Sequence, residues 1–265
     1  MTTLRARFLL ALLICSAPGL GLNITTGEAS LTYLNVDGKY GRAWFICDGL
    51  DVPSITVGGV PDAHNRARFT VYSKTRPGSY AYSFYDVGAG DPGAGSVRYP
   101  LTSRGGKAGE GDDLTLANLG GPKTPDRTFT PPFLSLTVGG TRTDCRWLKG
   151  TRLMGFSKRR SFLVTQAPDG ALTYQTFDFG DAGTARPVMP DGVQRSSTPS
   201  LTVRGGGRQM SASTETFTFQ NNGYSYAVRV ARLGQAPGAS VTVSKGGRTL
   251  QTEPLTGYTY APPVK

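Results

Sequence analysis

The chain has 265 residues and a formal net charge of +11, and it contains 36 Gly and 18 Pro. Charged residues make up only 18% of the chain and four of them are Glu, so the composition typical of long helices is missing. Hydrophobic residues, at 38%, are enough to bury a core, which excludes a chain that is disordered throughout. The single histidine, His64, excludes a zinc site with two histidine ligands.

Residues 1–21 predict an export signal peptide. Arg5 and Arg7 precede an unbroken apolar run at 8–14, and small residues follow up to Gly21. The run is too short to cross a bilayer as a helix, and no later segment of the sequence resembles it. We therefore expect a protein that is secreted or held in the periplasm or cell envelope, with no transmembrane span in the mature chain.

Three cysteines bear on anchoring and on redox state. Cys15 ends the apolar run and raises the alternative of a lipid anchor. Ile14 precedes it, whereas a lipid-modified cysteine follows a small residue, so we expect Cys15 to leave with the signal. The two that remain, Cys47 and Cys145, predict one disulfide in an oxidising compartment. Two separate buried thiols are the alternative.

Apolar and polar residues alternate with a period of two in many short segments, among them 31–36, 217–219 and 224–230. Turn dipeptides of the Asp-Gly and Asn-Gly type separate such segments, as at 37–38 and 222–223. Short alternating strands with tight turns are typical of antiparallel sheets, so the sequence predicts an all-β fold. The first such pair, around Asp37 and Gly38, predicts an N-terminal β-hairpin.

Five segments recur later in the chain in the same order, at offsets that grow from 92 or 93 to 105 residues. The paired segments are 69–71 and 162–164, 82–88 and 174–180, 101–106 and 201–206, 114–118 and 217–221, and 135–138 and 240–243. Ordered matches with drifting offsets are typical of a diverged tandem duplication with small insertions. Chance resemblance among strands rich in Gly and Thr is the alternative.

The predicted organisation has three parts. Residues 1–21 are the export signal, residues 22–150 hold the N-terminal hairpin and the first β repeat, and residues 151–265 hold a basic junction and the second β repeat. We expect two tandem, diverged antiparallel repeats, each resembling a β-sandwich.

Motifs for catalysis are missing from the sequence. It has neither a Gly-x-Ser-x-Gly nucleophile motif nor a Gly-rich phosphate loop, and the polar stretch around His64 predicts an exposed loop residue. Asp86 and Asp178 occupy equivalent places in the two repeats, and a glycosidase needs two carboxylates. Aspartate at a strand end more often starts a turn, so we expect no catalytic residue and no cofactor.

The densest acidic cluster comprises Glu110, Asp112 and Asp113. Calcium takes six to eight oxygen ligands, to which this loop could contribute, but the cluster lacks the spacing of a calcium loop. We therefore expect a solvated acidic turn and no metal site.

The positive charge is concentrated where the two repeats join. No acid occurs between Asp144 and Asp169, and the same stretch contains six basic residues, namely Arg146, Lys149, Arg152, Lys158, Arg159 and Arg160. If these side chains share a surface, they predict a binding site for an anionic envelope polymer or glycan. A basic face that only aids solubility is the alternative. No nucleic-acid-binding signature occurs, so we expect no nucleic-acid partner.

Three tyrosine pairs with one residue between them follow a glycine: Tyr80 and Tyr82, Tyr224 and Tyr226, and Tyr258 and Tyr260. In a strand, the two rings of each pair lie on one face. We expect these rings to pack in the core, and stacking against sugar rings on an exposed face is the alternative.

These observations favour an exported cell-envelope or extracellular binding protein that engages an anionic polymer or surface. The first alternative is a protein-binding module, such as an inhibitor or an assembly subunit. The second alternative is a carboxylate-dependent glycan hydrolase.

Overall fold

The computed structural model describes residues 30–50, 52–103, 111–117, 133–148, 150–182 and 198–261. Almost all regular structure in these ranges is antiparallel β-sheet, which confirms the all-β fold class. The predicted export signal and Cys15 lie outside the described residues.

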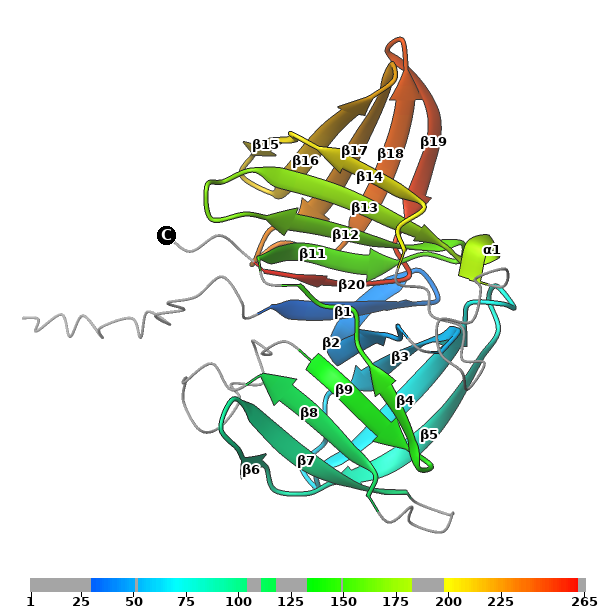
Figure 1. Ribbon diagram of the computed structural model, residues 1–265, viewed down its shortest axis with the longest axis vertical. Helices are drawn as coiled ribbons and strands as arrows, with labels where there is room; N and C mark the ends of the chain where they lie inside the picture. The colour runs from blue at the N-terminus through cyan, green and yellow to red at the C-terminus, as the bar shows by residue number, and fades with distance from the viewer. Residues whose placement is uncertain are drawn as a thin grey trace, which may run out of the picture.

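The strands form two lobes, which lie one above the other in Figure 1. The N-terminal lobe contains β1 (Leu31–Val36), β2 (Lys39–Asp48), β3 (Ser54–Gly59), β4 (Arg66–Ser73), β5 (Tyr80–Val87), β6 (Asp91–Pro92), β7 (Ser96–Ser103), β8 (Asp113–Ala117), β9 (Phe133–Val138) and β10 (Thr141–Asp144). The C-terminal lobe contains β11 (Thr151–Phe156), β12 (Arg160–Gln166), β13 (Leu172–Asp178), the short helix α1 (Phe179–Ala182), β14 (Leu201–Arg204), β15 (Gly207–Met210), β16 (Thr214–Asn221), β17 (Tyr224–Ala231), β18 (Ala239–Lys245), β19 (Arg248–Pro254) and β20 (Gly257–Tyr260).

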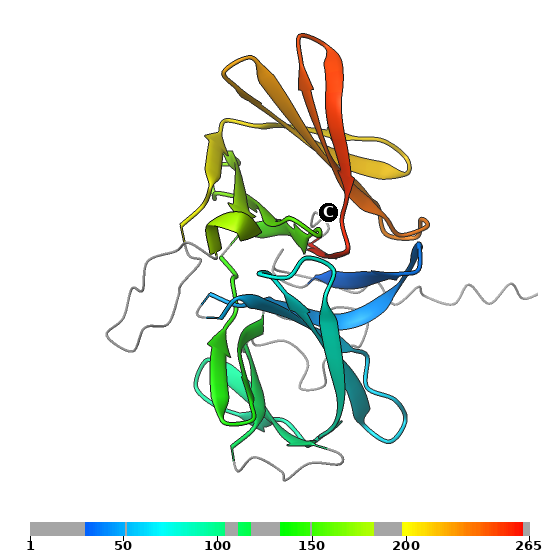
Figure 2. The ribbon, with the colours of Figure 1, turned by 90° about the vertical axis from the view of Figure 1, so that its right-hand side faces the viewer.

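One 15-stranded sheet runs through both lobes, in the order β10-β9-β8-β7-β5-β4-β3-β2-β1-β20-β11-β12-β13-β14, with β6 beside β7. The sheet bends, so that β2–β5 and β7–β10 form the two layers of the N-terminal lobe (Figure 2). In the C-terminal lobe, β11–β14 form one layer, and a separate five-stranded sheet, β15–β19, forms the other.

The first and last strands of the described chain join the lobes. β1 pairs with β2 on one edge and with β20 on the other, and β20 pairs in turn with β11. The hydroxyls of Thr32 in β1 and Thr259 in β20 lie 2.9 Å apart in a buried hydrogen bond. Strands from opposite ends of the sequence therefore hold the two lobes as one sheet.

The predicted N-terminal hairpin is confirmed, because β1 and β2 pair directly around a two-residue turn. Both turn residues have positive φ angles, 52° at Asp37 and 84° at Gly38. This combination is the tight turn whose twist matches that of the flanking strands, and it explains the Asp-Gly sequence.

Each lobe has its own apolar core. In the N-terminal lobe, Phe45 and Phe69 pack with Leu114 between the two layers. In the C-terminal lobe, Phe162 and Phe217 belong to the equivalent cluster. Strands that contribute to these cores from one face alternate in burial, as β16 does, which accounts for the period-two pattern of the sequence.

A third apolar cluster lies between the lobes. Here Ile46 and Ile55, from β2 and β3, pack with Met154 and Leu163, from β11 and β12. The last six residues of β2 and all six of β11 are buried, because both faces of these strands are covered. The C-terminal lobe thus covers the outer face of β2 and β3, the strands of the β2–β5 layer that lie nearest to β1.

The topology agrees with part of the predicted duplication, since β4, β5 and β7 pair in order, as β12, β13 and β14 do. Four of the five segment pairs fall on strands that follow one another in the same order, β4 and β12, β5 and β13, β7 and β14, and β8 and β16. The register also corresponds, since Phe69 lies opposite Gly58 and Phe162 lies opposite Gly155. The strand pairing of the fourth pair differs, because β8 pairs with β7, whereas β14 and β16 belong to different sheets. The fifth pair differs as well, because β9 pairs with β8, whereas β17 separates β18 from β16. The duplication itself stays a prediction.

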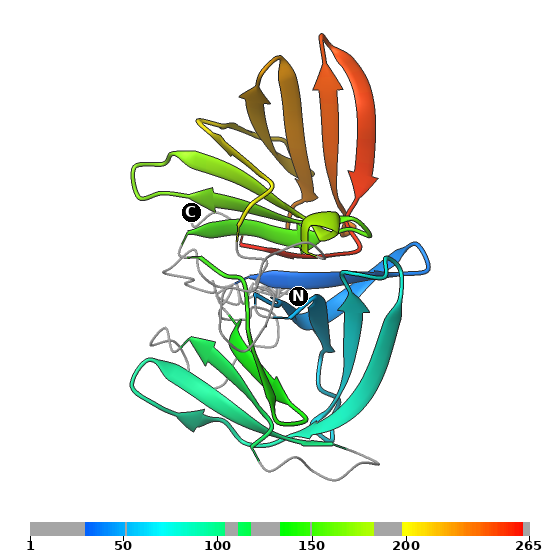
Figure 3. The same ribbon diagram turned by 45° about the vertical axis from the view of Figure 1, so that its right-hand side comes forward.

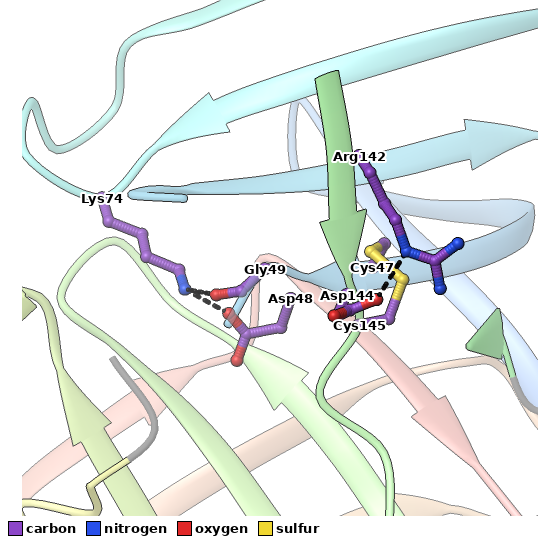
Figure 4. The surroundings of a disulfide bond; sticks show 7 residues. All are labelled: Cys47, Asp48, Gly49, Lys74, Arg142, Asp144 and Cys145. Atoms are coloured by element: carbon purple, nitrogen blue, oxygen red, sulfur yellow. Dashed lines mark hydrogen bonds and ion pairs between the residues drawn. A yellow bond between two sulfur atoms is a disulfide. The ribbon is translucent and has the colours of Figure 1, made fainter. Parts of the chain in front are cut away.

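The predicted disulfide is confirmed between Cys47 in β2 and Cys145, which directly follows β10 (Figure 4). The two cysteines are 98 residues apart in the sequence. Next to the disulfide, an antiparallel β-bridge pairs Gly49 with Cys145. The disulfide therefore fastens the end of the N-terminal lobe to its second strand.

Removing the disulfide should destabilise the protein. Replacing Cys47 and Cys145 by alanine should lower the free energy of unfolding by about 4 kcal/mol, because the unfolded chain no longer contains a closed loop of 98 residues. Urea unfolding with and without reductant measures the effect, and the double variant is the control that should not respond to reductant. Equal unfolding midpoints for the oxidised and reduced wild type would contradict this role of the bond.

Candidate functional site

Arg146, the first of the six basic residues predicted to bind a ligand, is buried. Its Nε lies 2.8 Å from Oδ2 of Asp48, and its guanidinium carbon lies 3.4 Å from the centroid of the Phe177 ring in the C-terminal lobe. Arg146 therefore connects the lobes from inside the protein. Lys149 lies outside the described residues.

Arg152 and Arg160 also face carboxylates of the C-terminal lobe. Arg152 is buried, and its Nη2 lies 3.7 Å from Oε1 of the buried Glu215. Arg160 is half-buried, and its Nε lies 3.2 Å from Oδ1 of Asp178 and 3.7 Å from Oε2 of Glu253. The charge of both arginines is compensated within the C-terminal lobe.

Lys158 and Arg159 are exposed at the turn between β11 and β12. In the part of the chain that the structure describes, neither side chain makes an ion pair. Ser157 fixes this turn, because its hydroxyl accepts hydrogen bonds from the backbone N–H of Arg159 and Arg160 and donates one to Glu253. The structure thus brings two of the six predicted residues together on the surface, buries Arg146 and Arg152, and leaves Arg160 half-buried.

A cleft with a volume of about 990 Å³ opens at the junction of the lobes. Its floor is the outer face of β3 and β4, including Val57 and Tyr72. The β1–β2 hairpin, residues 34–41, forms one wall, and residues 156–159 of the β11–β12 turn and residues 251–256 at the end of β19 cover it. Figure 3 shows these segments meeting on the same side of the molecule.

The described lining of the cleft is rich in cations. It contains four basic side chains and two acidic ones, which are Arg42, Arg68, Lys158, Arg159, Asp37 and Glu253. Glu253 is already engaged, because it accepts hydrogen bonds from Ser157 and Gln251 and lies beside Arg160. The local excess of positive charge favours an anion.

Arg42 and Arg68 were missed by the sequence analysis because they lie far from the basic stretch. Both sit beside aromatic rings, with the Arg42 guanidinium carbon 5.1 Å from the Tyr33 centroid and that of Arg68 4.1 Å from the Tyr82 centroid. The sequence held one signal for Arg68. Arg66, Arg68 and Tyr72 are separated by even numbers of residues, which places them on one face of a strand.

The three tyrosine pairs have different environments. Tyr258 and Tyr260 are buried in the core of the C-terminal lobe, as expected, and Tyr224 and Tyr226 are half-buried. Tyr80 and Tyr82 are 57% and 55% exposed, so the expectation of core packing is wrong for them.

Asp86 and Asp178 lie in different lobes and do not line the cleft. Each is directly opposite an arginine in the neighbouring strand, Arg66 in the first case and Arg160 in the second. His64 is exposed in the loop before β4, as expected.

The acidic cluster is not the solvated turn that its sequence predicts. Asp112 is buried and accepts a hydrogen bond from the backbone N–H of Gly140, and Asp113 is buried beside Arg98 at 2.9 Å. Glu110 lies outside the described residues. The two described carboxylates therefore connect the start of β8 to β7 and to the turn between β9 and β10.

A buried charge cluster holds the end of β2 beside the disulfide (Figure 4). Oδ1 of Asp48 lies 2.6 Å from Nζ of Lys74, which also donates a 2.7 Å hydrogen bond to the carbonyl of Gly49. Oδ2 of Asp48 faces Arg146. Burial alone would raise the pKa of Asp48, but Lys74 and Arg146 outweigh it and hold this pKa below its ordinary value.

Replacing Asp48→Asn should lower the free energy of unfolding by about 3–5 kcal/mol, because two buried cations lose their shared counter-charge. The matched control, Asp144→Asn, removes an exposed pair with Arg142 and should cost about 0–1 kcal/mol. Urea unfolding at pH 7 compares the two variants. Equal losses in the two variants would contradict the importance of this cluster.

The same cluster predicts a loss of stability in acid. Since the folded-state pKa of Asp48 is depressed, its contribution is complete above the unfolded-state pKa of about 4 and disappears as the pH falls through the folded-state pKa. Between pH 5 and the acid limit of folding, urea midpoints should therefore fall more for the wild type than for Asp48→Asn. Parallel pH profiles would contradict the assignment.

The chain matches no family model, and comparisons with curated proteins and with solved structures give no match. Within the described ranges, no helix is long and apolar enough to cross a membrane. The same ranges contain no group of three or more His, Cys, Asp or Glu side chains placed to hold a metal ion. Because no comparison matches, a functional proposal has to be based on the residues of the cleft.

Proposed function

We propose that this is an exported binding protein that takes a segment of an anionic polymer into the cleft between its lobes. The observation that carries the proposal is the set of basic side chains at the cleft, where Lys158 and Arg159 on one side face the sheet that presents Arg42 and Arg68. The two lobes thus contribute charge of the same sign to one site.

Two of the basic side chains at the cleft differ from the other arginines of the junction in their ion pairs. Arg146, Arg152 and Arg160 are compensated by carboxylates, whereas Lys158 and Arg159 make no ion pair with any described carboxylate. Exposed cations attract anions over roughly 8–10 Å at physiological salt. A ligand reaching this turn would therefore meet two exposed cations that pair with no carboxylate in the described ranges.

The cleft is large enough to take part of a polymer chain. Its volume of about 990 Å³ is at the upper end of the range of about 300–1,000 Å³ for small-molecule sites. Polar and apolar residues alternate along its floor, with Thr70 beside Tyr72 and Val57. A polymer segment could fill such a space while its ends continue into solvent.

The disulfide supports the exported location. Bonds of this kind persist in oxidising compartments and are rare in the cytosol. The polymers available outside the cytoplasm include acidic glycans and anionic envelope polymers, which carry the charge that the cleft would complement. Neither Asp86 nor Asp178 lines the cleft, which favours binding over the carboxylate-dependent hydrolysis of a glycan.

Reversing the charge at the cleft should weaken binding. The double variant Lys158→Glu and Arg159→Glu should lower the affinity for polygalacturonate by about tenfold or more, because two favourable charges become repulsive. Titration calorimetry at two salt concentrations measures the affinity, and the wild type should bind more weakly at the higher concentration.

The matched control changes the same residue types at another hairpin. Lys245→Glu and Arg248→Glu alter the exposed turn between β18 and β19, which lies at the far tip of the C-terminal lobe in Figure 1, and they change the net charge equally. This control should retain most of the affinity. If both double variants lose the same affinity, net charge alone determines binding and the cleft is not the site.

A further inference from the structure

Three exposed aromatic rings line one face of β5. Tyr80, Tyr82 and Phe84 are 57%, 55% and 43% exposed, and they alternate along the strand, so their side chains point to the same side. The ring centroids of Tyr82 and Phe84 are 5.9 Å apart. Large apolar side chains gathered on an exposed face typically mark a binding surface.

This aromatic stripe, Tyr80, Tyr82 and Phe84, begins inside the cleft. Tyr80 lines the cleft and lies opposite Tyr72, whose ring centroid is 5.6 Å away. Tyr72 in turn lies 5.2 Å from Phe156 of the C-terminal lobe, also by ring centroids. The stripe therefore leads from the junction of the lobes out along the uncovered part of the β2–β5 layer.

Basic and hydroxyl side chains accompany the rings on the neighbouring strand. Thr70 lies opposite Tyr82 and Arg68 lies opposite Phe84 in the register of β4 and β5. The Arg68 guanidinium carbon is 4.1 Å from the Tyr82 centroid, and Arg68 also lines the cleft. Thr70 is buried, so the exposed surface offers flat apolar rings, the tyrosine hydroxyls and a cation within a few residues of one another.

We propose that the ligand is an acidic polysaccharide, which places carboxylates at the basic cleft and stacks sugar rings on the aromatic stripe. This inference rests on the proposed function and names the chemical class of its ligand. A sugar residue has an apolar C–H face that packs on an aromatic ring and hydroxyls that bond to polar neighbours. A uronic acid residue adds the carboxylate that Arg68, Lys158 and Arg159 would complement.

The regular spacing of the rings suits a polysaccharide. Here the rings of Tyr80 and Tyr82 stand more than half exposed on a strand. Alternate residues of a strand are about 6.6–6.8 Å apart, so the rings form a regular row suited to a repeating ligand.

Replacing Tyr82→Ala tests the inference with two polymers that carry carboxylates. Polygalacturonate has sugar rings, whereas poly-L-glutamate of similar charge density has none. The wild type should bind polygalacturonate more tightly, and Tyr82→Ala should weaken this binding by about fivefold through the loss of one stacking ring. Binding of poly-L-glutamate should fall less, because that polymer loses only the support that the Tyr82 ring gives to Arg68. Tyr82→Phe, which keeps the ring, should retain the affinity for polygalacturonate.

The matched control is Tyr224→Ala, which removes a tyrosine stacked on Lys245 in the hairpin region of the C-terminal lobe. It should bind both polymers as the wild type does, and urea unfolding verifies that each variant is folded. If the wild type binds both polymers equally and Tyr82→Ala changes neither, the polysaccharide assignment fails while the proposed function stands. If Tyr82→Ala weakens both equally, the ring does not act by stacking on sugar rings, and the polysaccharide assignment fails. If the wild type binds neither polymer, the proposed function itself fails.

Discussion

The pairing of β1 with β20 is the constraint on which the rest of the structure depends. It inserts the last described strand between the first strand and β11, and so turns two lobes into one continuous sheet. The apolar cluster between the lobes can form only because this pairing holds β2 and β3 against β11 and β12. The cleft is a consequence of the same geometry, since the C-terminal lobe covers the β2–β5 layer near β1 and leaves β4 and β5 partly uncovered.

Burial divides the basic residues into two groups with different roles. Arg146 and Lys74 surround Asp48 beside the disulfide, in a place where an unpaired charge would be costly. Arg146 also stacks on Phe177, so this cluster connects the end of the N-terminal lobe to β13. Lys158 and Arg159 are left at the mouth of the cleft, on a turn that Ser157 holds in place. Their position, more than the total charge of the chain, supports the proposed binding role.

The sequence predicted those features that depend on local chemistry. Alternation in segments such as β16 led to the fold class, and the Asp37–Gly38 turn led to the hairpin. The disulfide followed from the two cysteines that remain after the predicted signal. Pairing between distant strands was not predictable, because nothing in β1 or β20 alone specifies its partner. The burial of Arg146 and Arg152 was missed for the same reason: Asp48 and Glu215, which compensate them, are 98 and 63 residues away in the chain.

The cleft could be predicted only in part. A concentration of charge at 146–160 pointed to the junction of the lobes, where the cleft lies, but Arg42 and Arg68 come from strands that reach it through the fold. The exposure of Tyr80 and Tyr82 follows from how far the C-terminal lobe extends over β4 and β5, which no strand pattern encodes. Tyr258 and Tyr260 share their spacing but lie in β20, where both lobes cover them.

The central claim is that an anionic polymer binds between the lobes. Hydrogen–deuterium exchange with and without polygalacturonate tests it most directly, because it reports which backbone amides the bound polymer protects. We expect protection at the β11–β12 turn around Lys158 and along β4 and β5, with no change at the β18–β19 hairpin. Protection confined to the β15–β19 sheet, or none at saturating polymer, would contradict the claim.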